Sequence, residues 1–414
     1  MSGILNMLIR KIFCLLFIIV LQSCYQKEIN KGKENPFSIS LGSFKTYEKA
    51  FQFKSRLDTV VRANLRLEYV SKKNYKLLYG KFHNSLSAGE KAYELYCDTL
   101  INDYDITRNG IKVLDEFINV PFIGNFLGKP SLYTYNIKNK NTELLWSQKD
   151  GKVISLNLSE AADHAFFSTA ASAGQFGGLP FIKNVNLFLL HRIEDNIDQI
   201  DELGDGYQFY TYWNAPDSFY VNISFSDSNN PRIIYQRIQS YDLQGKRKSS
   251  SERSFDIIKQ GFPVAPSRKP QLTSPNLNCQ LRIVHNNDQS IFYLKNFLDK
   301  SEILISSINE KIKDIRWSSD GNYFFIVSEF KVRISKRIYE SRNHIFIIDA
   351  ANKKVKKILE GNRFENLLVR GKLVFFDELF NGTKRIVIYD YVNRKHFDYI
   401  ELPGGCGLNT LNGN

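Results

Sequence analysis

The sequence lacks the short signatures by which several large enzyme classes are identified. It contains no Gly-x-Ser-x-Gly elbow of a serine hydrolase, no His-Glu-x-x-His pair of a metalloprotease and no phosphate-cradling glycine loop. Its six histidines are dispersed, and no two of them have the spacing of metal ligands. We therefore expect no catalytic residue, no metal site and no cofactor that the sequence alone identifies.

Cysteine is also scarce, with five among 414 residues. Cys14 and Cys24 lie close to the N-terminus, which leaves Cys97, Cys279 and Cys406 for the rest of the chain. Three cysteines allow at most one intramolecular disulfide and leave an odd thiol. Because their spacing fits neither a zinc site nor a redox Cys-x-x-Cys motif, we interpret them as isolated buried cysteines.

Long apolar runs are absent except near the N-terminus. Residues 12 to 21 form an apolar stretch of ten residues after the basic pair Arg10 and Lys11. This pattern is typical of a signal peptide, and it is too short for a transmembrane helix, which needs roughly 20 apolar residues. Either Met1 or Met7 can be the true start, because both precede the basic pair.

Leu21-Gln22-Ser23-Cys24 ends this stretch and resembles the lipobox of bacterial lipoproteins, although Gln22 replaces the usual small residue. The resemblance implies that residues 1 to 23 are a cleaved signal peptide and that Cys24 is acylated. Several acyl chains would hold the protein at a lipid bilayer of the bacterial cell envelope, on the periplasmic face or the cell surface. The alternatives are an uncleaved anchor helix and an ordinary secretory signal with an incidental cysteine.

Acidic residues are outnumbered by basic ones. Without Arg10 and Lys11, 54 of the 56 basic residues remain against 43 acidic ones, a net charge of +11. Such a balance can favour nucleic acid or an anionic surface, but export argues against nucleic acid. The basic residues are scattered, with local clusters at 246 to 248 and 353 to 357 that we expect in turns. We interpret them as a solvated rim.

The rest of the chain consists of short alternating or apolar runs separated by turn residues, a pattern that predicts antiparallel strands. One pattern recurs, an apolar run that ends in a polar residue. The final residues of successive copies are 41 to 55 residues apart. A period of this size, with four strands per repeat, is typical of a β-propeller. We predict an all-β propeller of six or seven blades, with a pair of β-sandwiches as the alternative. The six copies are Leu132–Asn136, Phe188–His191, Ile238–Asp242, Ile291–Lys295, Ile345–Asp349 and Ile386–Asp390.

The expected domain organisation follows from these segments. Residues 1 to 23 are the signal peptide, the polar residues 24 to 36 are a lipidated tether, and residues 37 to 414 are the propeller domain. Three further apolar runs lie between residues 37 and 100, namely Leu65–Val70, Tyr75–Tyr79 and Ala92–Tyr96. We expect them to be strands that form another blade or complete the last one.

A turn motif resembles that of one group of propellers. Residues 317 to 321, Trp-Ser-Ser-Asp-Gly, precede an apolar strand, and Asp320-Gly321 suits a tight hairpin because glycine tolerates positive φ. The motif resembles the Trp-Ser-Pro-Asp-Gly turn of TolB-type and prolyl-oligopeptidase-type propellers, and residues 146 to 151 are a looser copy. With the lipobox and the repeat spacing, the chain resembles the TolB-like six-bladed propeller lipoproteins of Bacteroidetes. The resemblance implies a fold and a location.

Two segments are candidate binding sites. Residues 161 to 180 are rich in alanine and glycine, and His164 and Gln175 supply polar groups there. We expect this loop to line a ligand or partner surface, unless its small residues only pack a strand near the central axis. Residues 194 to 206 are acidic and could hold Ca²⁺, but they lack the spacing of an EF-hand, and a solvated loop explains them equally well.

We predict a non-enzymatic propeller that binds a protein, peptide or glycan partner through the loops at one end. The alternative is an envelope polysaccharide lyase or glycoside hydrolase with a dispersed site in the channel. A glycosidase needs two carboxylates, and the 43 acidic residues select no pair. Clustered carboxylates, or Tyr, His and Arg side chains within about 6 Å of one another, would favour the enzyme. An exposed aromatic patch would favour the binding protein.

Overall fold

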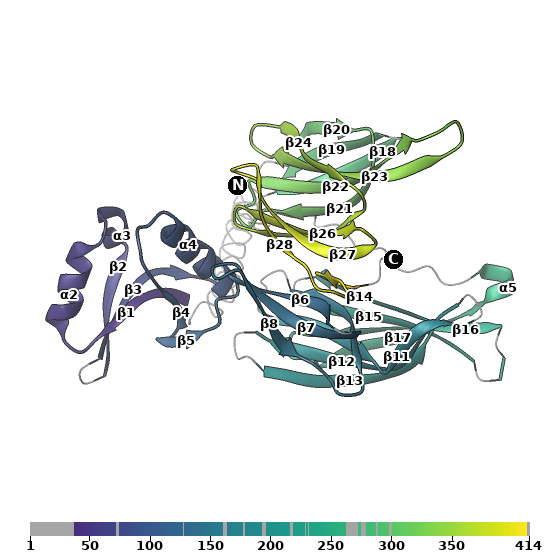
Figure 1. Cartoon of the computed structure of the whole chain (residues 1–414), viewed down its shortest axis with the longest axis horizontal. Coiled ribbons are helices and arrows are strands. Elements are labelled where there is room, and N and C mark those ends of the chain that lie inside the picture. Colours follow the sequence, from purple (N-terminus) through teal and green to yellow (C-terminus); the bar gives the residue numbers. More distant parts are fainter. Residues whose placement is uncertain are drawn as a thin grey trace, which may run out of the picture. The chain divides into compact units, whose positions relative to one another are not determined.

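The computed structural model describes residues 37–411 except 72–73, 127, 160–163, 177–178, 193–195, 216–217, 228, 231, 262–271, 275–278, 287–288 and 298–299. The chain divides into two compact units, one that ends at Asp115 and one that begins at Glu116 (Figure 1). None of the helices in the described ranges has the length and apolar character needed to cross a membrane. The expected signal peptide and tether, with Cys24, lie outside the described residues.

The first unit is a five-stranded antiparallel sheet with three helices, in the strand order β2-β3-β1-β4-β5. Helices α2 and α4 contact both central strands, β1 and β3. A helix after β1 and another after β3, with the order β2-β3-β1-β4, is the ferredoxin-like arrangement. The bounds are β1 (Phe37–Phe44), α2 (Tyr47–Arg56), α3 (Thr59–Ala63), β2 (Leu65–Ser71), β3 (Asn74–Phe82), α4 (Ser85–Cys97), β4 (Asp105–Arg108) and β5 (Ile111–Val113).

The two halves of this unit repeat one local structure. Each half passes from a central strand through a Gly-x-Phe segment, at residues 42–44 and 80–82, into a helix. Gly80 has a φ of 65°, and a Cβ there would lie 2.6 Å from the Phe82 ring. The side chains of Thr46 and Asn84 then cap α2 and α4 by accepting backbone N–H groups. The repeat places the two helices equivalently on the sheet.

This unit corrects the expectation for residues 37 to 115. We expected the propeller to begin at residue 37 and residues 37 to 100 to form or complete a blade, whereas these residues form a unit of their own. Ala92–Tyr96, expected as a strand, belongs to α4. Ala88, Ala92 and Leu95 are all buried, and their spacing of three to four residues is that of a helix face.

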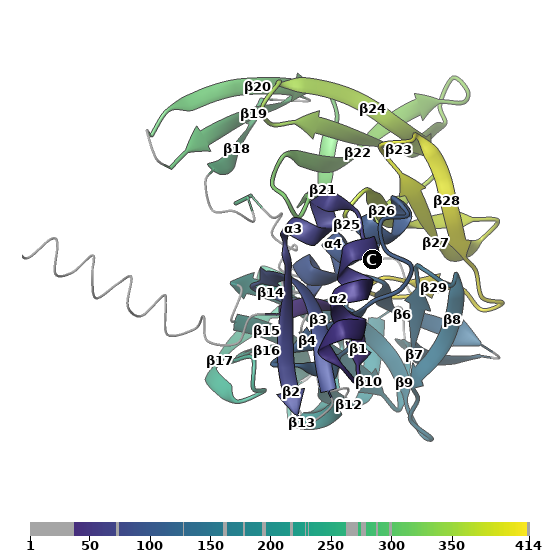
Figure 2. The same ribbon diagram turned by 90° about the vertical axis from the view of Figure 1, so that its left-hand side faces the viewer.

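The second unit is an all-β propeller, and six sheets are described in it. The sheets follow one another in the order of the sequence, from β6 to β28 (Figure 2). Blade 1 contains β6 (Asn119–Phe126), β7 (Lys129–Asn136), β8 (Asn141–Trp146) and β29 (Cys406–Gly407). Blade 2 contains β9 (Lys152–Leu158), β10 (His164–Ala170), β11 (Ser172–Phe176), β12 (Leu179–His191) and β13 (Asn196–Gly206). Blade 3 contains β14 (Gln208–Ala215), β15 (Ser218–Ser226), β16 (Ile233–Tyr241) and β17 (Arg247–Asp256), followed by helix α5 (Ile257–Gln260).

Three further sheets follow in the second unit. Blade 4 contains β18 (Cys279–Asn286), β19 (Gln289–Asn296) and β20 (Glu302–Ile308). Blade 5 contains β21 (Lys311–Trp317), β22 (Tyr323–Arg333), β23 (Tyr339–Asp349) and β24 (Lys354–Gly361). Blade 6 contains β25 (Phe364–Arg370), β26 (Leu373–Phe380), β27 (Thr383–Asp390) and β28 (Lys395–Ile400).

The recurring run of the sequence marks one strand in every sheet. Its six copies lie in β7, β12, β16, β19, β23 and β27. Each of these strands pairs on both sides, so each is an inner member of its sheet. Because both faces of these strands are buried, their sequences are continuous apolar runs and do not alternate strictly between apolar and polar residues.

The hydrophobic cores lie between neighbouring blades. Phe166 and Phe167 are successive, fully buried residues of β10. Phe166 stacks on Phe219 of blade 3 with ring centroids 4.1 Å apart, whereas Phe167 packs with Ile123 of blade 1. Successive side chains of a strand point to opposite faces, so a doubly buried blade needs apolar residues at both positions. Blades 4, 5 and 6 share cores in the same way.

The C-terminal segment closes blade 1. Cys406 of β29 pairs with Gly124 of β6, so the last strand of the chain joins the first sheet of the propeller. The backbone N–H of Leu156 donates to the carbonyl of Asn409 at 2.9 Å, which extends the contact to blade 2. Residues far apart in the sequence thus complete one sheet.

The turn motif at residues 317 to 321 is a hairpin between β21 and β22. Gly321 has a φ of 71°, and the Asp320 carboxylate accepts the backbone N–H of Asn322 at 3.0 Å. The looser copy at residues 146 to 151 is different, because it connects β8 of blade 1 to β9 of blade 2. Only the first segment is therefore a turn within a blade.

Candidate functional site

The structure does not bring together the two residues singled out as a binding loop. His164 begins β10 and pairs with His191, at the far end of β12 from Pro180, which pairs with Gln175. These two positions on β12 are eleven residues apart, a separation of at most roughly 36 Å at about 3.3 Å per residue. Residues 164–170 and 172–176 are two strands of blade 2, β10 and β11, rather than a loop.

Each of these predicted residues has its own surroundings. The His164 and His191 rings meet edge to face with centroids 5.4 Å apart, and His191 Nε2 lies 3.4 Å from an Asp198 oxygen. Gln175 is described only through its backbone in β11. We expected His164 and Gln175 to line one surface. They lie instead against opposite ends of β12 in blade 2.

The acidic segment expected as a loop is strand β13 from residue 196 onward. Asp201 accepts hydrogen bonds from the Tyr241 hydroxyl and from Arg247 Nη2, the latter at 2.6 Å. Within the described ranges, no group of three or more His, Cys, Asp or Glu side chains is placed to hold a metal ion. The described structure therefore gives this segment a role in packing blade 2 against blade 3.

The three cysteines of the described units are free thiols. Cys406 is fully buried, as expected, and donates to the carbonyl of Ile400 at 2.9 Å. Burial raises the pKa of the Cys406 thiol to about 12, so the thiol is protonated at physiological pH. Cys279 is partly buried, and Cys97 is exposed, which corrects the expectation that all three are buried.

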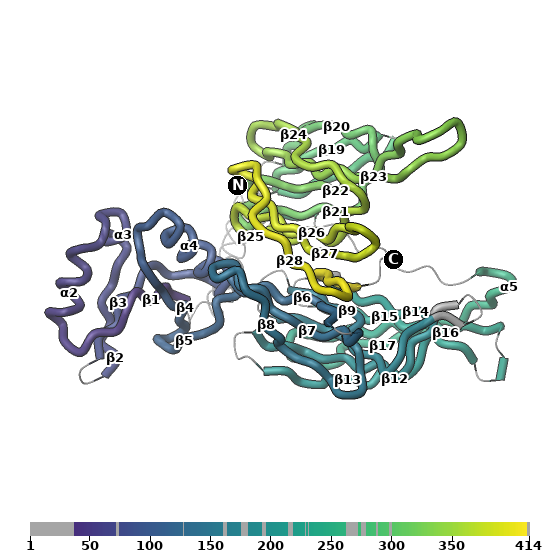
Figure 3. The backbone as a smooth tube through the Cα atoms, in the orientation of Figure 1, coloured from purple at the N-terminus to yellow at the C-terminus, as the bar shows by residue number. Residues whose placement is uncertain are grey.

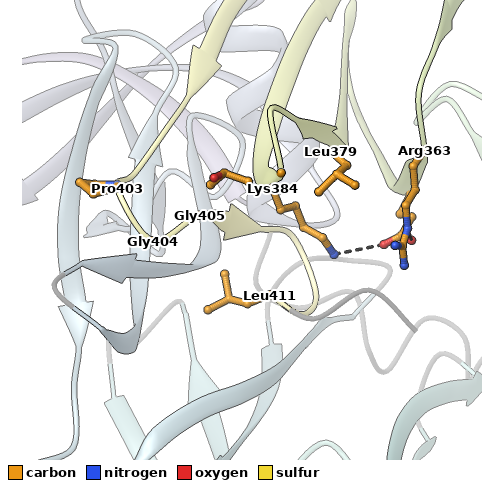
Figure 4. A pocket seen from close by; sticks show the side chains of 10 residues that line it. Arg363, Leu379, Lys384, Pro403, Gly404, Gly405 and Leu411 are labelled. Carbon is orange, nitrogen blue, oxygen red and sulfur yellow. Dashed lines mark hydrogen bonds and ion pairs between the residues drawn. The ribbon is translucent and has the colours of Figure 1, made fainter.

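A polar pocket of about 210 Å³ lies where β26 turns into β27 in blade 6. Figure 4 shows Lys384 pointing across this pocket toward the side that carries Arg363. Because the lining comes from the start of β25, the β26–β27 turn and the segment after β28, no short stretch of sequence contains the site. The lining residues are Arg363, Glu365, Leu379, Gly382, Thr383, Lys384, Pro403, Gly404, Gly405 and Leu411.

The charged groups around the pocket form one network. Lys384 Nζ lies 3.1 Å from a Glu365 oxygen, 3.1 Å from the carbonyl of Thr410 and 3.7 Å from an Asp377 oxygen. Arg363 Nε donates to the other Glu365 oxygen at 2.8 Å. The network thus ties blade 6 to the C-terminal segment that closes the ring.

Asp377 lies beneath the pocket and is almost completely buried. Its two oxygens accept hydrogen bonds from Asn366 Nδ2 at 2.7 Å and from the backbone N–H of Leu408 at 2.8 Å. Burial is the largest influence and raises the pKa of Asp377 to about 7, although Lys384 and the hydrogen bonds pull it downward. Asp377 therefore changes its charge near neutral pH.

Glu365 differs from Asp377 because it lies between two cations. Burial would raise the pKa of Glu365, but the neighbouring Lys384 and Arg363 hold that pKa below its usual value. Glu365 is therefore ionised at neutral pH, and the pocket presents two cations beside one fixed anion. Protonation of Asp377 removes negative charge from beneath Lys384, so the pocket becomes more positive as the pH falls.

A second charged cluster lies in blade 5. The His344 ring bonds through Nδ1 to Glu310 at 2.8 Å and through Nε2 to Glu360 at 3.0 Å. Phe330 stacks on the ring with a centroid distance of 3.9 Å, and Ser328 donates to Glu310. No sequence motif predicts this cluster, because its members come from three strands and from the turn before β21.

Comparisons with known proteins found distant structural likenesses. No protein-family model matches the sequence, and no curated protein matches it. TolB from Acinetobacter baumannii is similar at 12% identity and a TM-score of 0.44, over 83% of this chain and 81% of TolB. An oligogalacturonate lyase from Vibrio parahaemolyticus has 11% identity and a TM-score of 0.41, over 66% and 86%. A nidogen and laminin complex has 9% identity and a TM-score of 0.39, over 68% and 93%.

These similarities concern the fold alone. The propeller predicted from the recurring strand run is the fold of the second unit, and the sheets of this chain define it. The kinship with lipoproteins of Bacteroidetes stays a prediction. The function is inferred from this chain's own residues.

Proposed function

We propose that the protein is an envelope lipoprotein, anchored through acylated Cys24, whose propeller binds a protein, peptide or glycan partner. The observation that carries the binding function is the pocket in blade 6, where Arg363 and Lys384 converge from different segments. The lipobox and the polar tether support the location. The propeller supplies a rigid frame whose connecting turns form the binding surface.

The chemistry of the pocket fits an acidic group on the partner. The Arg363 side chain is 46% exposed, and a guanidinium presents planar N–H donors that match a carboxylate. Lys384 is only 8% exposed and is held by Glu365 and Thr410, so it contributes positive potential without having to be ordered on binding. A carboxylate of a peptide, a protein side chain or an acidic sugar has the charge and size for this site.

The test compares capture of partners by matched variants. Full-length protein is cross-linked in its native envelope and purified as wild type, Arg363→Gln and Arg394→Gln. Arg394 is the matched control, because it is also an exposed arginine with positive φ in blade 6 but lies in the β27–β28 turn at the other end.

We expect wild type and Arg394→Gln to enrich the same partner. Arg363→Gln should lower its recovery roughly 10-fold or more, since a hydrogen bond to a charged group contributes about 1.5–3 kcal/mol. Equal recovery by all three proteins would exclude the pocket as the binding site.

One observation favours the enzymatic alternative, an envelope polysaccharide lyase or glycoside hydrolase. Glu310, His344 and Glu360 gather within hydrogen-bonding distance, as an acid and base group would. However, His344 is 7% exposed, and carboxylates already occupy both ring nitrogens, so substrate would have to displace one of them. Polysaccharide cleavage by the purified protein that is lost in His344→Gln but kept in Arg394→Gln would establish the enzyme instead.

A further inference from the structure

The longest hairpin of blade 5 projects beyond its own sheet. β21 pairs with β22 only as far as Glu329, and β24 pairs with β23 only from Asn343 onward. Between these points and the turn, residues 330–333 pair with residues 339–342 and with no other described strand. We name residues 330–342 the basic finger. Figure 3 traces it past the neighbouring strands of blade 5.

The basic finger is strongly positive. It contains five basic residues and one acidic residue, a net charge of +4, which equals that of the lysine cluster at residues 353 to 357. Its single acid, Glu340, is 3.2 Å from Arg342 at the base. No ion pair to a carboxylate is found in the described structure for the four cations nearer the tip, which are Lys331, Arg333, Lys336 and Arg337.

The tip also exposes apolar side chains. Ile334, Ile338 and Tyr339 are 61%, 60% and 58% exposed, although each is a residue type that is usually at least partly covered. The backbone holds the tip in shape, because Ile334 N–H donates to the Ile338 carbonyl at 2.9 Å and Arg333 Nε donates to the Ser335 carbonyl at 3.1 Å. The finger is thus a formed hairpin whose apolar tip is surrounded by cations.

We propose that the basic finger docks on the surface of an anionic lipid membrane. Lysine and arginine near such a surface are attracted by its negative potential, and tyrosine and aliphatic side chains favour the interface just below the headgroups. The apolar tip selects this partner over a soluble polyanion, which would contact the cations and leave both isoleucines in water. Phe330, stacked on His344, fixes the base of the finger to blade 5.

The docking has a geometric consequence for the propeller. The finger is the β22–β23 turn, which is equivalent in its blade to the β26–β27 turn that lines the pocket. Equivalent turns lie at the same end of a propeller, so the finger directs the pocket's end toward the membrane. This deepens the proposed function, because it places the partner's acidic group close to the bilayer surface.

The test measures binding to lipid vesicles by flotation. The protein begins at Tyr25, so it lacks the lipid-bearing cysteine but keeps every residue that the structure describes. The vesicles contain phosphatidylcholine alone or phosphatidylcholine with phosphatidylglycerol. The charge variant is Lys331→Gln with Lys336→Gln and Arg337→Gln, and the apolar variant is Ile334→Ser with Ile338→Ser.

The control variant replaces the same number of charges at the other end of blade 5. It carries Lys353→Gln, Lys354→Gln and Lys356→Gln, three exposed lysines in and beside the β23–β24 turn. Thermal unfolding followed by circular dichroism confirms that each variant is folded. A variant that unfolds is replaced by its single substitutions, so that every comparison is made between folded proteins.

We expect wild type and the control to bind the anionic vesicles and not the neutral ones. The charge variant should bind roughly 100-fold more weakly, because each cation near an anionic surface contributes about a 5-fold factor. The apolar variant should also bind more weakly, and its remaining binding should disappear at lower salt than that of wild type.

Three results would overturn the proposal. The first is unchanged binding by the charge variant, and the second is an equal loss in the control, which would reflect overall charge alone. The third is an apolar variant that binds like wild type while soluble polygalacturonate competes fully, which would make the finger a polyanion site. A negative result in the vesicle experiment does not test the proposed function, because the partner capture uses full-length protein and probes a different site, the pocket at Arg363.

Discussion

Replacing Asp377 by asparagine should remove a pH dependence from the stability of the propeller. Asp377 is buried beside Lys384, and burial raises the pKa of this carboxyl from 3.8 to about 7. The folded state therefore binds this proton more tightly than the unfolded chain does. The contribution of Asp377 to stability is greatest below the unfolded pKa and decreases as the pH rises through the folded pKa.

The size of the effect follows from the distance between the two pKa values. Each pKa unit corresponds to about 1.4 kcal/mol. Between about pH 5 and pH 8, titration of Asp377 should lower the free energy of unfolding by roughly 2–3 kcal/mol. Asp377→Asn carries no charge at any pH, so this part of the pH dependence should vanish, whatever the absolute stability of the variant.

Urea unfolding followed by tryptophan fluorescence measures the stability of the second unit, which contains Asp377. The protein has three tryptophans, Trp146, Trp213 and Trp317, and all belong to the propeller. Wild type and Asp377→Asn are compared at several pH values, with Asp150→Asn as the control at an exposed carboxylate. Each variant removes one carboxylate and leaves every other titratable group in the sequence, so the difference between their slopes isolates Asp377. A variant slope equal to that of wild type would refute the assignment of a raised pKa.

Three further predictions concern the anchor, the core and the closure. Cys24→Ser should abolish incorporation of labelled palmitate and release the protein from the membrane fraction, and retained label would contradict the lipobox interpretation. Phe166→Ala should lower the free energy of unfolding by about 3–5 kcal/mol, because its ring stacks on Phe219 between blades 2 and 3, and a change below about 1 kcal/mol in urea unfolding would argue against that core. Truncation after Leu402 removes β29 and should make blade 1 sensitive to limited proteolysis, so unchanged resistance would show that closure does not depend on β29.

The propeller was predictable because its strongest signal repeats. In each blade the strand pattern is an apolar run such as Ile386–Tyr389, buried on both faces and followed by the turn residue Asp390. The first unit was not predictable in the same way, because residues 92 to 96 alternate like a strand. The helix becomes visible only when Ala88 is included, since burial then recurs at the helical spacing.

The candidate site could not be predicted because its residues are not neighbours in the sequence. Arg363, Lys384 and Thr410 belong to three segments that meet only after blade 6 and the C-terminal segment are in place. The composition of residues 161 to 180 was a local signal, but it reflects a long strand pair in blade 2 rather than a binding loop. The raised pKa of Asp377 arises from its burial in the folded structure, so the sequence pattern alone does not predict it.

The position of β29 has a consequence for the order in which the protein folds. β6 is among the first strands of the propeller to be synthesised, and its partner Cys406 is added to the chain much later. Until residue 406 emerges, β6 has an unpaired edge that can template aggregation. The first unit contains its own complete sheet and can fold long before this point. Synthesis that stalls before residue 406 should therefore leave a protein with a folded first unit and a propeller that depends on chaperones.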